Sequence, residues 1–249
     1  MAQKFSLTQD AYQRLRADLL SCRLKPGERL RINDLCKQLS VSLGAVREAL
    51  SRLTSEGLVS AEPQLGFTVA PISAVDLKDL TVVRTEIEGL CLRQSIANGD
   101  LAWESRIVAA YHRLSRTPHY APDDPKRLNE SYASAHAEFH QELVSACRSI
   151  WLHRMRNILF AQAARYVALS VPLARKERDR NKEHRELMDA VIGRDGAQAT
   201  QLMSAHLNLT AQIILEALGS SANDDAESFN RPENAMAARS NTLQRLRAD

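Results

Sequence analysis

The stretch that decides the fold is VSLGAVREALSRLTSEGLVSAEPQLGFTV, at residues 41–69. Its first half carries apolar residues at helical spacing and predicts a helix over 42–57, which Gly57 ends as a C-terminal cap. Two short β-type runs, LVSAEP and FTVAPI, follow on either side of the turn that contains Gly66. The pattern predicts a helix followed directly by a two-stranded wing.

Two further helical patterns precede this stretch. Residues 8–21, TQDAYQRLRADLLS, carry a threonine cap and apolar side chains three or four residues apart, and residues 32–39, INDLCKQL, form a short second helix. The proline and glycine of LKPGERL break the chain between them. We therefore expect a helix-turn-helix with a wing over residues 1–73.

The second helix of such a motif is the one that enters the major groove of DNA. Arg47 and Arg52 lie on it here, and the arginine fork can bind guanine or a phosphate with two hydrogen bonds. Residues 1–72 hold ten Lys or Arg against seven Asp or Glu, whereas residues 73–249 hold 23 of each, so the formal charge of +3 falls on the first part. The alternative for the helix is an amphipathic helix whose polar face is simply solvated. The alternative for the charge is a small surplus that has no functional role.

From about residue 74 the hydrophobic period is helical throughout. The expected helices lie at 75–97, 101–116, 126–147, 149–171, 175–192 and 196–217. The fold class predicted is mainly α, with a winged helix-turn-helix over 1–73 and an all-α antiparallel bundle of about six helices over 74–218. Residues 219–249 are polar and aperiodic, so we expect a largely disordered tail with a frayed helix in TLQRLRAD.

Composition excludes several classes of protein. The chain is 44% hydrophobic and 25% charged, which is ordinary for a globular protein. The N-terminal sequence lacks an apolar signal core, and no stretch reaches the roughly 20 apolar residues of a membrane span, so we expect a cytoplasmic protein. Its four cysteines are scattered without a CxxC motif, which predicts reduced and mostly buried thiols.

Four histidines lie on the apolar faces of predicted helices. In HAEFHQELVSA, at residues 136–146, His136 and His140 are four apart and therefore share a helix face, while His184 and His206 lie among apolar residues on two later helices. A lone inward histidine is more often a satisfied core residue than a ligand. Four that converge are better explained by a metal ion, since each would otherwise cost about 1–3 kcal/mol if left unpaired.

The remaining histidines, His112, His119 and His153, follow no such pattern and are expected at surface or loop positions. Arg84 is the other polar residue on an apolar face, one helical turn from Leu80. Without a ligand, its role would be an ion pair with Glu88, worth about 0.3–0.5 kcal/mol if exposed.

The quoted stretch resembles the winged helix-turn-helix of GntR-family transcription regulators, whose pattern is VSxxxVREALxRLxxEGLV followed by a wing that bears glycine. The similarity covers about residues 8–72 and implies binding to double-stranded, palindromic operator DNA. It implies that Arg47 and Arg52 meet DNA, that Ser42 contacts the backbone and that Gly66 lets the wing approach the minor groove. Arg31 is a further candidate for a phosphate contact.

One departure from that family lies at Leu43-Gly44-Ala45, where the family commonly has Arg-Thr-Pro. A base-reading arginine and a hydroxyl are missing there. We expect an operator that differs from the usual family site, or weaker direct readout offset by recognition of DNA shape.

The C-terminal part resembles the FCD type of GntR regulator, named after the FadR C-terminal domain, over about residues 74–217. Six helices rather than seven make it similar to the VanR-like branch. The resemblance implies one metal ion held by His140, His184, His206 and the residue four positions before His140. It also implies that Arg84, in VVRTEIE, faces the effector cavity and binds a carboxylate; Arg165 and Tyr166 are weaker candidates for the same pocket, with helix surface and packing as their alternative.

His136 stands where that family usually has an aspartate. Four neutral imidazoles leave a divalent site at +2 instead of +1, which favours an anionic effector and a preference for zinc, nickel or cobalt over manganese. Zinc is the metal we expect, and whether His136 ligates directly stays open.

These observations predict a homodimeric transcription regulator, a repressor, whose bundle binds a metal ion and a small carboxylate that alters operator affinity. A purely structural metal in the same regulator is one alternative. A metal-dependent enzyme is a weaker one, because Glu138 and Glu142, which flank His136 and His140 in sequence, lie about 100° or more around the helix.

Overall fold

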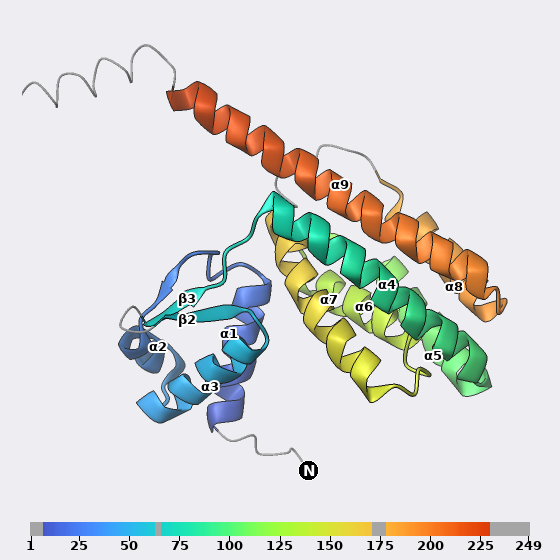
Figure 1. Cartoon of the computed structure of the whole chain (residues 1–249), viewed down its shortest axis with the longest axis horizontal. Coiled ribbons are helices and arrows are strands. Elements are labelled where there is room, and N and C mark those ends of the chain that lie inside the picture. Colours follow the sequence, from blue (N-terminus) through green and yellow to red (C-terminus); the bar gives the residue numbers. More distant parts are fainter. Residues whose placement is uncertain (1–6, 63–65, 171–177, 230–249) are drawn as a thin grey trace, which may run out of the picture.

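The computed structural model describes residues 7–62, 66–170 and 178–229. Figure 1 shows a small N-terminal domain of helices and short strands, joined by one connection to a bundle of long helices. The predicted fold class is confirmed.

The N-terminal domain contains three helices and a three-stranded antiparallel sheet of order β1-β3-β2. Its elements are α1 (Leu7–Leu20), β1 (Arg29–Leu30), α2 (Ile32–Leu39), α3 (Leu43–Ser55), β2 (Val59–Glu62) and β3 (Gly66–Val69). Aliphatic side chains from all three helices and from the sheet form one core beneath α3. The strand β1 was not expected, because two residues are too few to show an alternating pattern.

Local chemistry fixes both ends of α3. Ser42 accepts a hydrogen bond from the backbone N–H of Ala45 at 3.3 Å and so caps the first turn. At the other end Gly57 has φ +70°, a left-handed conformation that only glycine adopts without strain. The helix therefore ends at Ser55, two residues before the expected end.

The bundle contains six helices in the described part of the chain, as predicted. They are α4 (Ala74–Asn98), α5 (Leu101–Arg116), α6 (Glu130–Leu143), α7 (Ile150–Ser170), α8 (Arg180–Ile192) and α9 (Gly196–Phe229). In Figure 1, α9 runs along one side of α4, and α7 lies along its other side. The core includes the buried side chains of Trp103, Ile107, Phe139 and Leu143.

The predicted helix over 126–147 is too long at both ends. Asn129 accepts a hydrogen bond from the N–H of Ser131 at 2.9 Å and so starts α6 at Glu130. The residues before it form an antiparallel hairpin of β4 (Tyr120–Ala121) and β5 (Asp124–Leu128), so the predicted helix was wrong over 126–128, which belong to β5. Strands this short, in a segment rich in Asp and Pro, carry no recognisable alternation.

The last two helices also differ from expectation. Asp179 caps α8 by accepting from the N–H of Lys182 at 2.9 Å, so α8 starts at Arg180 instead of 175; residues 175–177 lie outside the described residues. Helix α9 continues to Phe229, beyond the expected end at 217 and into the predicted tail. The residues after Gly219 are polar but contain no proline before Pro232, so nothing in the backbone stops the helix. The rest of the predicted tail, 230–249, lies outside the described residues.

Among the residues described, no helix is both long enough and apolar enough to cross a membrane.

Candidate functional site

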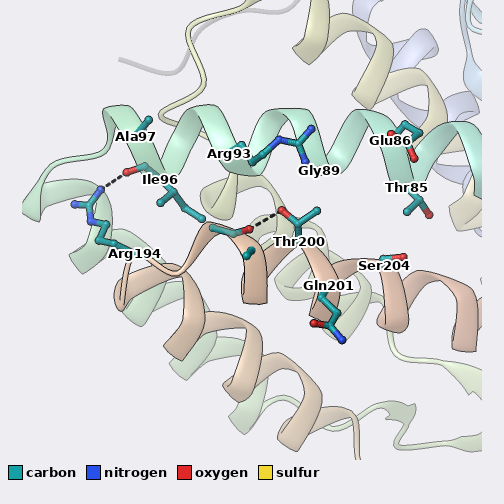
Figure 2. Close-up of a pocket in the computed structure, with 12 residues that line it drawn as sticks. Thr85, Glu86, Gly89, Arg93, Ile96, Ala97, Arg194, Thr200, Gln201 and Ser204 are labelled. Carbon is teal, nitrogen blue, oxygen red and sulfur yellow. Dashed lines mark hydrogen bonds between the residues drawn. The ribbon is translucent and has the colours of Figure 1, made fainter.

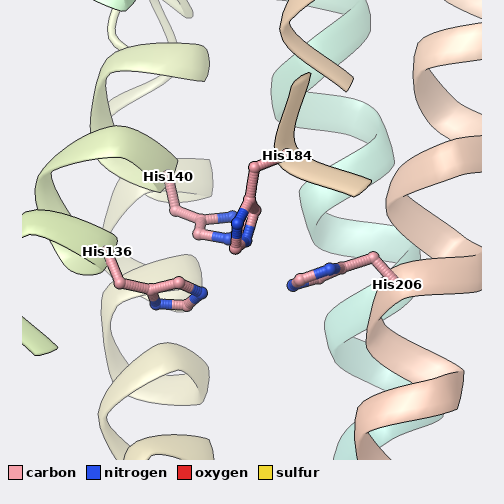
Figure 3. A group of neighbouring side chains, drawn as sticks. All are labelled: His136, His140, His184 and His206. Carbon is pink, nitrogen blue, oxygen red and sulfur yellow. The ribbon is translucent and has the colours of Figure 1, made fainter. Parts of the chain in front are cut away.

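The four predicted histidines converge at the centre of the bundle (Figure 3). Helix α6 supplies His136 and His140, α8 supplies His184 and α9 supplies His206. One ring nitrogen from each lies within 4.8 Å of the corresponding nitrogens of the other three. The ring centroids of His136 and His140 are 4.4 Å apart, and those of His184 and His206 are 4.9 Å apart.

Burial makes this cluster chemically distinctive. His140 and His184 are at most 1% exposed, and neither ring nitrogen of either side chain has a hydrogen-bond partner in the described structure. Burial, reinforced by the neighbouring histidines, holds the pKa of His136, His140 and His184 well below the ordinary value of 6.5. The rings are thus neutral at pH 7, the state in which imidazole binds a metal.

The residues present therefore fit a divalent metal ion. Buried polar atoms without partners are costly, and a shared ion would satisfy one nitrogen of each ring at once. Imidazole nitrogen suits zinc, nickel and cobalt. The cluster can hold a metal.

A carboxylate that sequence reasoning missed lies against this cluster. Glu183 Oε2 is 2.9 Å from His206 Nδ1, and Arg178 donates to both oxygens of Glu183 at 2.6 Å. Burial acts to raise the pKa of Glu183, but hydrogen bonds from Arg178 and His206 outweigh it and lower the pKa to about 2. The available signal was position, because Glu183 directly precedes His184 at the start of α8.

Arg84 lies beside the cluster, as the sequence predicted for an inward arginine. Its side chain is 11% exposed, and its Nε is 3.7 Å from Glu88 Oε1, which is too long for a hydrogen bond. Neither of these two atoms has another hydrogen-bond partner in the described structure. The guanidinium lies 5.0 Å from the ring centroid of Phe160, and that ring lies 6.3 Å from the ring of His140. Arg84 thus keeps an unsatisfied donor in a buried position.

Arg156, on α7, is a second residue that sequence reasoning missed. It is 2% exposed and donates to Glu88 Oε2, to Gln141 Oε1 and to the carbonyl oxygen of His140, each at 2.8 Å. It balances the buried carboxylate of Glu88 and holds the backbone of a candidate ligand.

Arg165 and Tyr166 contact the domain connection, which supports packing as their role. Arg165 donates to the carbonyl oxygen of Ala70, while the Tyr166 hydroxyl donates to Asp76 Oδ2 and accepts from the backbone N–H of Ser73 at 3.2 Å. Arg165 lies where α7 meets the N-terminal domain, and Tyr166 packs against Leu77 and Ile214 in the bundle.

The other three histidines lie outside the cluster. His112 is exposed on α5 and His153 binds the carbonyl oxygen of Cys147 at 2.8 Å on α7. His119 lies in the loop between α5 and β4, which agrees with the predicted loop position, but its Nδ1 is buried. Its ring lies 4.6 Å from that of Tyr132, which in turn stacks on His136. Burial and two nearby arginines lower the pKa of His119 to about 4.

The carboxylates weighed as possible general bases lie on the surface. Glu138 pairs with Arg113, and Glu142 pairs with Arg106 at 3.0 Å. Neither pair involves the histidines.

The five candidate DNA-binding residues are exposed on the N-terminal domain. Ser42 and Arg47 belong to the first turns of α3, where Leu43 is also 47% exposed, and Arg31 directly precedes α2. Gly66, with φ +87°, opens β3 in the wing. Arg52 is tied to α1, because it donates to Gln9 Oε1 at 2.8 Å and its guanidinium lies 3.9 Å from the Tyr12 ring centroid.

A separate surface hollow of about 720 Å³ lies between α4 and α9 (Figure 2). Its lining includes Gly89, Arg93 and Thr200, and Arg194 closes one end by donating to Ile96 O at 2.6 Å. None of the four clustered histidines lines it. The hollow is therefore distinct from the candidate metal centre.

Comparison with known proteins identifies both halves of the chain. Residues 7–69 match the family described as bacterial regulatory proteins, gntR family, and residues 79–209 match the FCD domain. The chain is 41% identical over 209 residues to the uncharacterized HTH-type transcriptional regulator BphR of Paraburkholderia xenovorans, covering 84% of this chain and 85% of that protein. It is 34% identical over 216 residues to the HTH-type transcriptional repressor GlaR of Escherichia coli, covering 84% and 96%.

Solved structures show the same fold. Escherichia coli McbR/YncC superposes with a TM-score of 0.72 at 20% identity, covering 85% of this chain and 98% of that one. A putative GntR transcriptional regulator from Rhodococcus sp. RHA1 superposes with a TM-score of 0.68 at 26% identity, covering 86% and 99%. With the sequence matches, these results show that the chain is a DNA-binding transcription regulator and not an enzyme, and that it belongs to the GntR family with an FCD domain behind its winged helix-turn-helix.

Proposed function

We propose that this regulator is a homodimeric, cytoplasmic repressor that binds a palindromic operator. In this proposal its bundle holds a divalent metal ion, most favourably zinc, and binds a small carboxylate that lowers the affinity for the operator. The observation that carries the proposal is the convergence of His136, His140, His184 and His206. In the part of the chain that the structure describes, the bundle has six helices, the number expected of the VanR-like branch. A bound ion would supply a Lewis-acidic centre that attracts carboxylate oxygens.

Arg84 is the residue we propose to bind the effector's carboxylate. It is buried, it is next to the histidines, and its Nε lacks a hydrogen-bond partner in the described structure. The ion pair of Arg84 with Glu88, at 3.7 Å, competes only weakly with an effector carboxylate, because Arg156 holds Glu88 at 2.8 Å. A carboxylate could therefore form two charge-assisted hydrogen bonds to Arg84 without displacing another ligand.

Helix α7 supports a route from this site to DNA. At one point along this helix, Arg156 donates to the carbonyl oxygen of His140, and Phe160 lies beside the imidazole ring of His140. Further along, Gln162 donates to the carbonyl oxygen of Glu56 at 2.8 Å, at the end of α3. We propose that movement of α7 on effector binding changes the placement of the winged domains, and a dimer that no longer matches its half-site spacing loses affinity.

Release of DNA by a carboxylate effector is tested by titrating a panel of small mono- and dicarboxylic acids into metal-loaded protein bound to fluorescent operator DNA. At least one acid should release the DNA. Because charge-assisted hydrogen bonds contribute about 1.5–3 kcal/mol, Arg84→Gln should need about 10–150-fold more of that acid. The exposed Arg93→Gln, on the same helix, should respond like the wild type.

A second variant separates sensing from transmission. Gln162→Ala should bind the acid with unchanged affinity, measured by calorimetry, while its DNA release is reduced. If no acid in the panel changes DNA affinity, or if Arg84→Gln responds normally, the proposed effector site is wrong.

Two copies are proposed because helix-turn-helix proteins read palindromic operators as dimers. Large apolar side chains lie exposed on two adjacent bundle helices: Val83 and Leu90 on α4, and Trp151, Met155 and Ile158 on α7. Trp151 is 65% exposed. Exposed apolar side chains on adjacent helices are typical of an association surface, and we propose that a second copy covers them.

Trp151→Glu is therefore expected to convert the dimer to a monomer, because it places a charge in an apolar interface. Sedimentation velocity at micromolar concentration would measure the change. Val108→Glu is the matched control, since Val108 is a 46% exposed residue of α5, outside the proposed face. A dimer that survives Trp151→Glu would move the interface elsewhere.

A purely structural metal is the second candidate function of the cluster. Four protein nitrogens suffice to close a tetrahedral zinc site, which is the arrangement of structural zinc. This alternative predicts a large fall in melting temperature on chelation together with DNA binding that no carboxylate changes. The acid titration described above therefore distinguishes the two.

A further inference from the structure

Arg178, Glu183 and His206 form a connected group at the edge of the histidine cluster. Arg178 directly precedes the capping residue of α8, Glu183 lies in the first turn of that helix, and His206 belongs to α9. From their geometry we infer that Glu183, clamped by Arg178, is a positioning residue that fixes the tautomer of His206 so that Nε2 is presented to the metal. The inference rests on the proposed metal site.

The distances decide which nitrogen of His206 carries the proton. Glu183 Oε2 lies 2.9 Å from Nδ1, and a carboxylate can only accept, so Nδ1 must be the donor. Arg178 Nη2 lies 3.2 Å from the same nitrogen but can only donate, so it makes no hydrogen bond to a protonated Nδ1. A neutral His206 with its proton on Nδ1 leaves the lone pair on Nε2 free to bind a metal.

Arg178 is fully engaged in holding this arrangement. Its Nε and Nη2 donate to the two oxygens of Glu183, and its Nη1 donates to Thr210 Oγ1 at 2.9 Å. Thr210 in turn donates to the carbonyl oxygen of His206 at 2.8 Å. The Arg178 side chain is only 7% exposed. These contacts fasten the start of α8 to α9 around His206.

This engagement distinguishes the two buried arginines beside the cluster. Every nitrogen of the Arg178 guanidinium has a partner, so Arg178 is unsuited to bind an effector, whereas Arg84 Nε has none in the described structure. Arg178 therefore organises a ligand, and Arg84 remains the residue that can meet an anion.

The histidines themselves are also unequal. His140 and His184 have no hydrogen-bond partner on either ring nitrogen in the described structure, so neither has a neighbour that selects its tautomer. His206 is already oriented. A carboxylate that orients a metal-binding histidine typically contributes about 10–100-fold to metal affinity. Glu183 accordingly sets how tightly the bundle holds its ion.

The first test compares zinc affinity of the full-length protein by competition with a chromophoric chelator. Glu183→Ala should bind zinc about 10–100-fold more weakly than the wild type. Glu186→Gln is the matched control on the same helix, because Glu186 pairs only loosely with Lys182, at 3.8 Å, and should bind zinc normally. Arg178→Lys keeps the charge but loses the fork, so it should fall between the two and serves if Glu183→Ala fails to fold.

The second test needs no metal. Nitrogen-15 spectra of histidine-labelled, metal-free protein should show the proton of His206 on Nδ1 in the wild type and in Glu186→Gln. In Glu183→Ala the proton should shift toward Nε2. A loss of packing alone would leave the tautomer unchanged.

The outcomes are separable. A wild type that binds no zinc overturns the proposed metal site, and the inference with it. A wild type that binds zinc with the same affinity as Glu183→Ala, or that carries the His206 proton on Nε2, overturns the inference alone.

Discussion

Replacing His140 with alanine is expected to remove the metal from the protein. The side chain is fully buried between α6 and α8, and no other described residue offers a nitrogen in its place. Loss of a direct ligand should cost more than the roughly 10–100-fold that changes around a ligand cost. Mass spectrometry of the untagged protein should therefore find about one zinc or nickel per chain in the wild type and almost none in His140→Ala.

His112→Ala is the control for this measurement, because His112 is exposed on α5 and belongs to no cluster. Its metal content should equal that of the wild type. A wild type without metal even after reconstitution with zinc would refute the histidine site while leaving the regulator's DNA binding intact. Metal retained in His140→Ala would exclude His140 as a ligand.

Replacing Arg47 with alanine should weaken operator binding about 5–150-fold, the effect of losing one bidentate contact worth about 1–3 kcal/mol. Arg47 is exposed near the start of α3, where Leu43 and Gly44 offer no hydrogen bond from their side chains. Few other groups on this helix can read a base, so the loss should be large. Fluorescence anisotropy at fixed salt measures it.

The salt dependence of binding then shows what Arg47 contacts. Loss of a base contact should leave the slope of affinity against salt unchanged, whereas loss of a phosphate contact should reduce it by about one. Arg113→Ala, an exposed arginine of the bundle paired with Glu138, should bind DNA like the wild type. Unchanged operator affinity in Arg47→Ala would mean that α3 does not recognise the operator through Arg47.

Local patterns were sufficient for the helices whose ends carry clear signals. The prediction of 101–116 coincides with α5, and that of 75–97 differs from α4 by one residue at each end. Both helices have a capping side chain, Asp100 and Ser73, directly before them. The β4–β5 hairpin was missed because its strands are held by pairing with each other and carry no periodicity of their own.

The candidate site also has a part that the sequence predicted and a part that only the fold decided. Spacing and apolar neighbours were enough to pick all four histidines, since a residue's face on a helix follows from its position alone. Whether the four faces meet at one point depends on how α6, α8 and α9 pack, and only the folded bundle brings the nitrogens within 4.8 Å.

Glu183 and Arg156 were missed by sequence reasoning for a physical reason. Glu183 orients His206 from 23 positions away, and Arg156 pairs with Glu88 across 68 positions. Each looks locally like an ordinary charge on a helix surface, and its burial is created by helices that are distant in the chain. The sequence determined the two domains, the recognition helix and the candidate ligands. Tertiary packing alone decided which charged residues hold those ligands in place, because the partners of a buried charge come from segments that are distant in the chain.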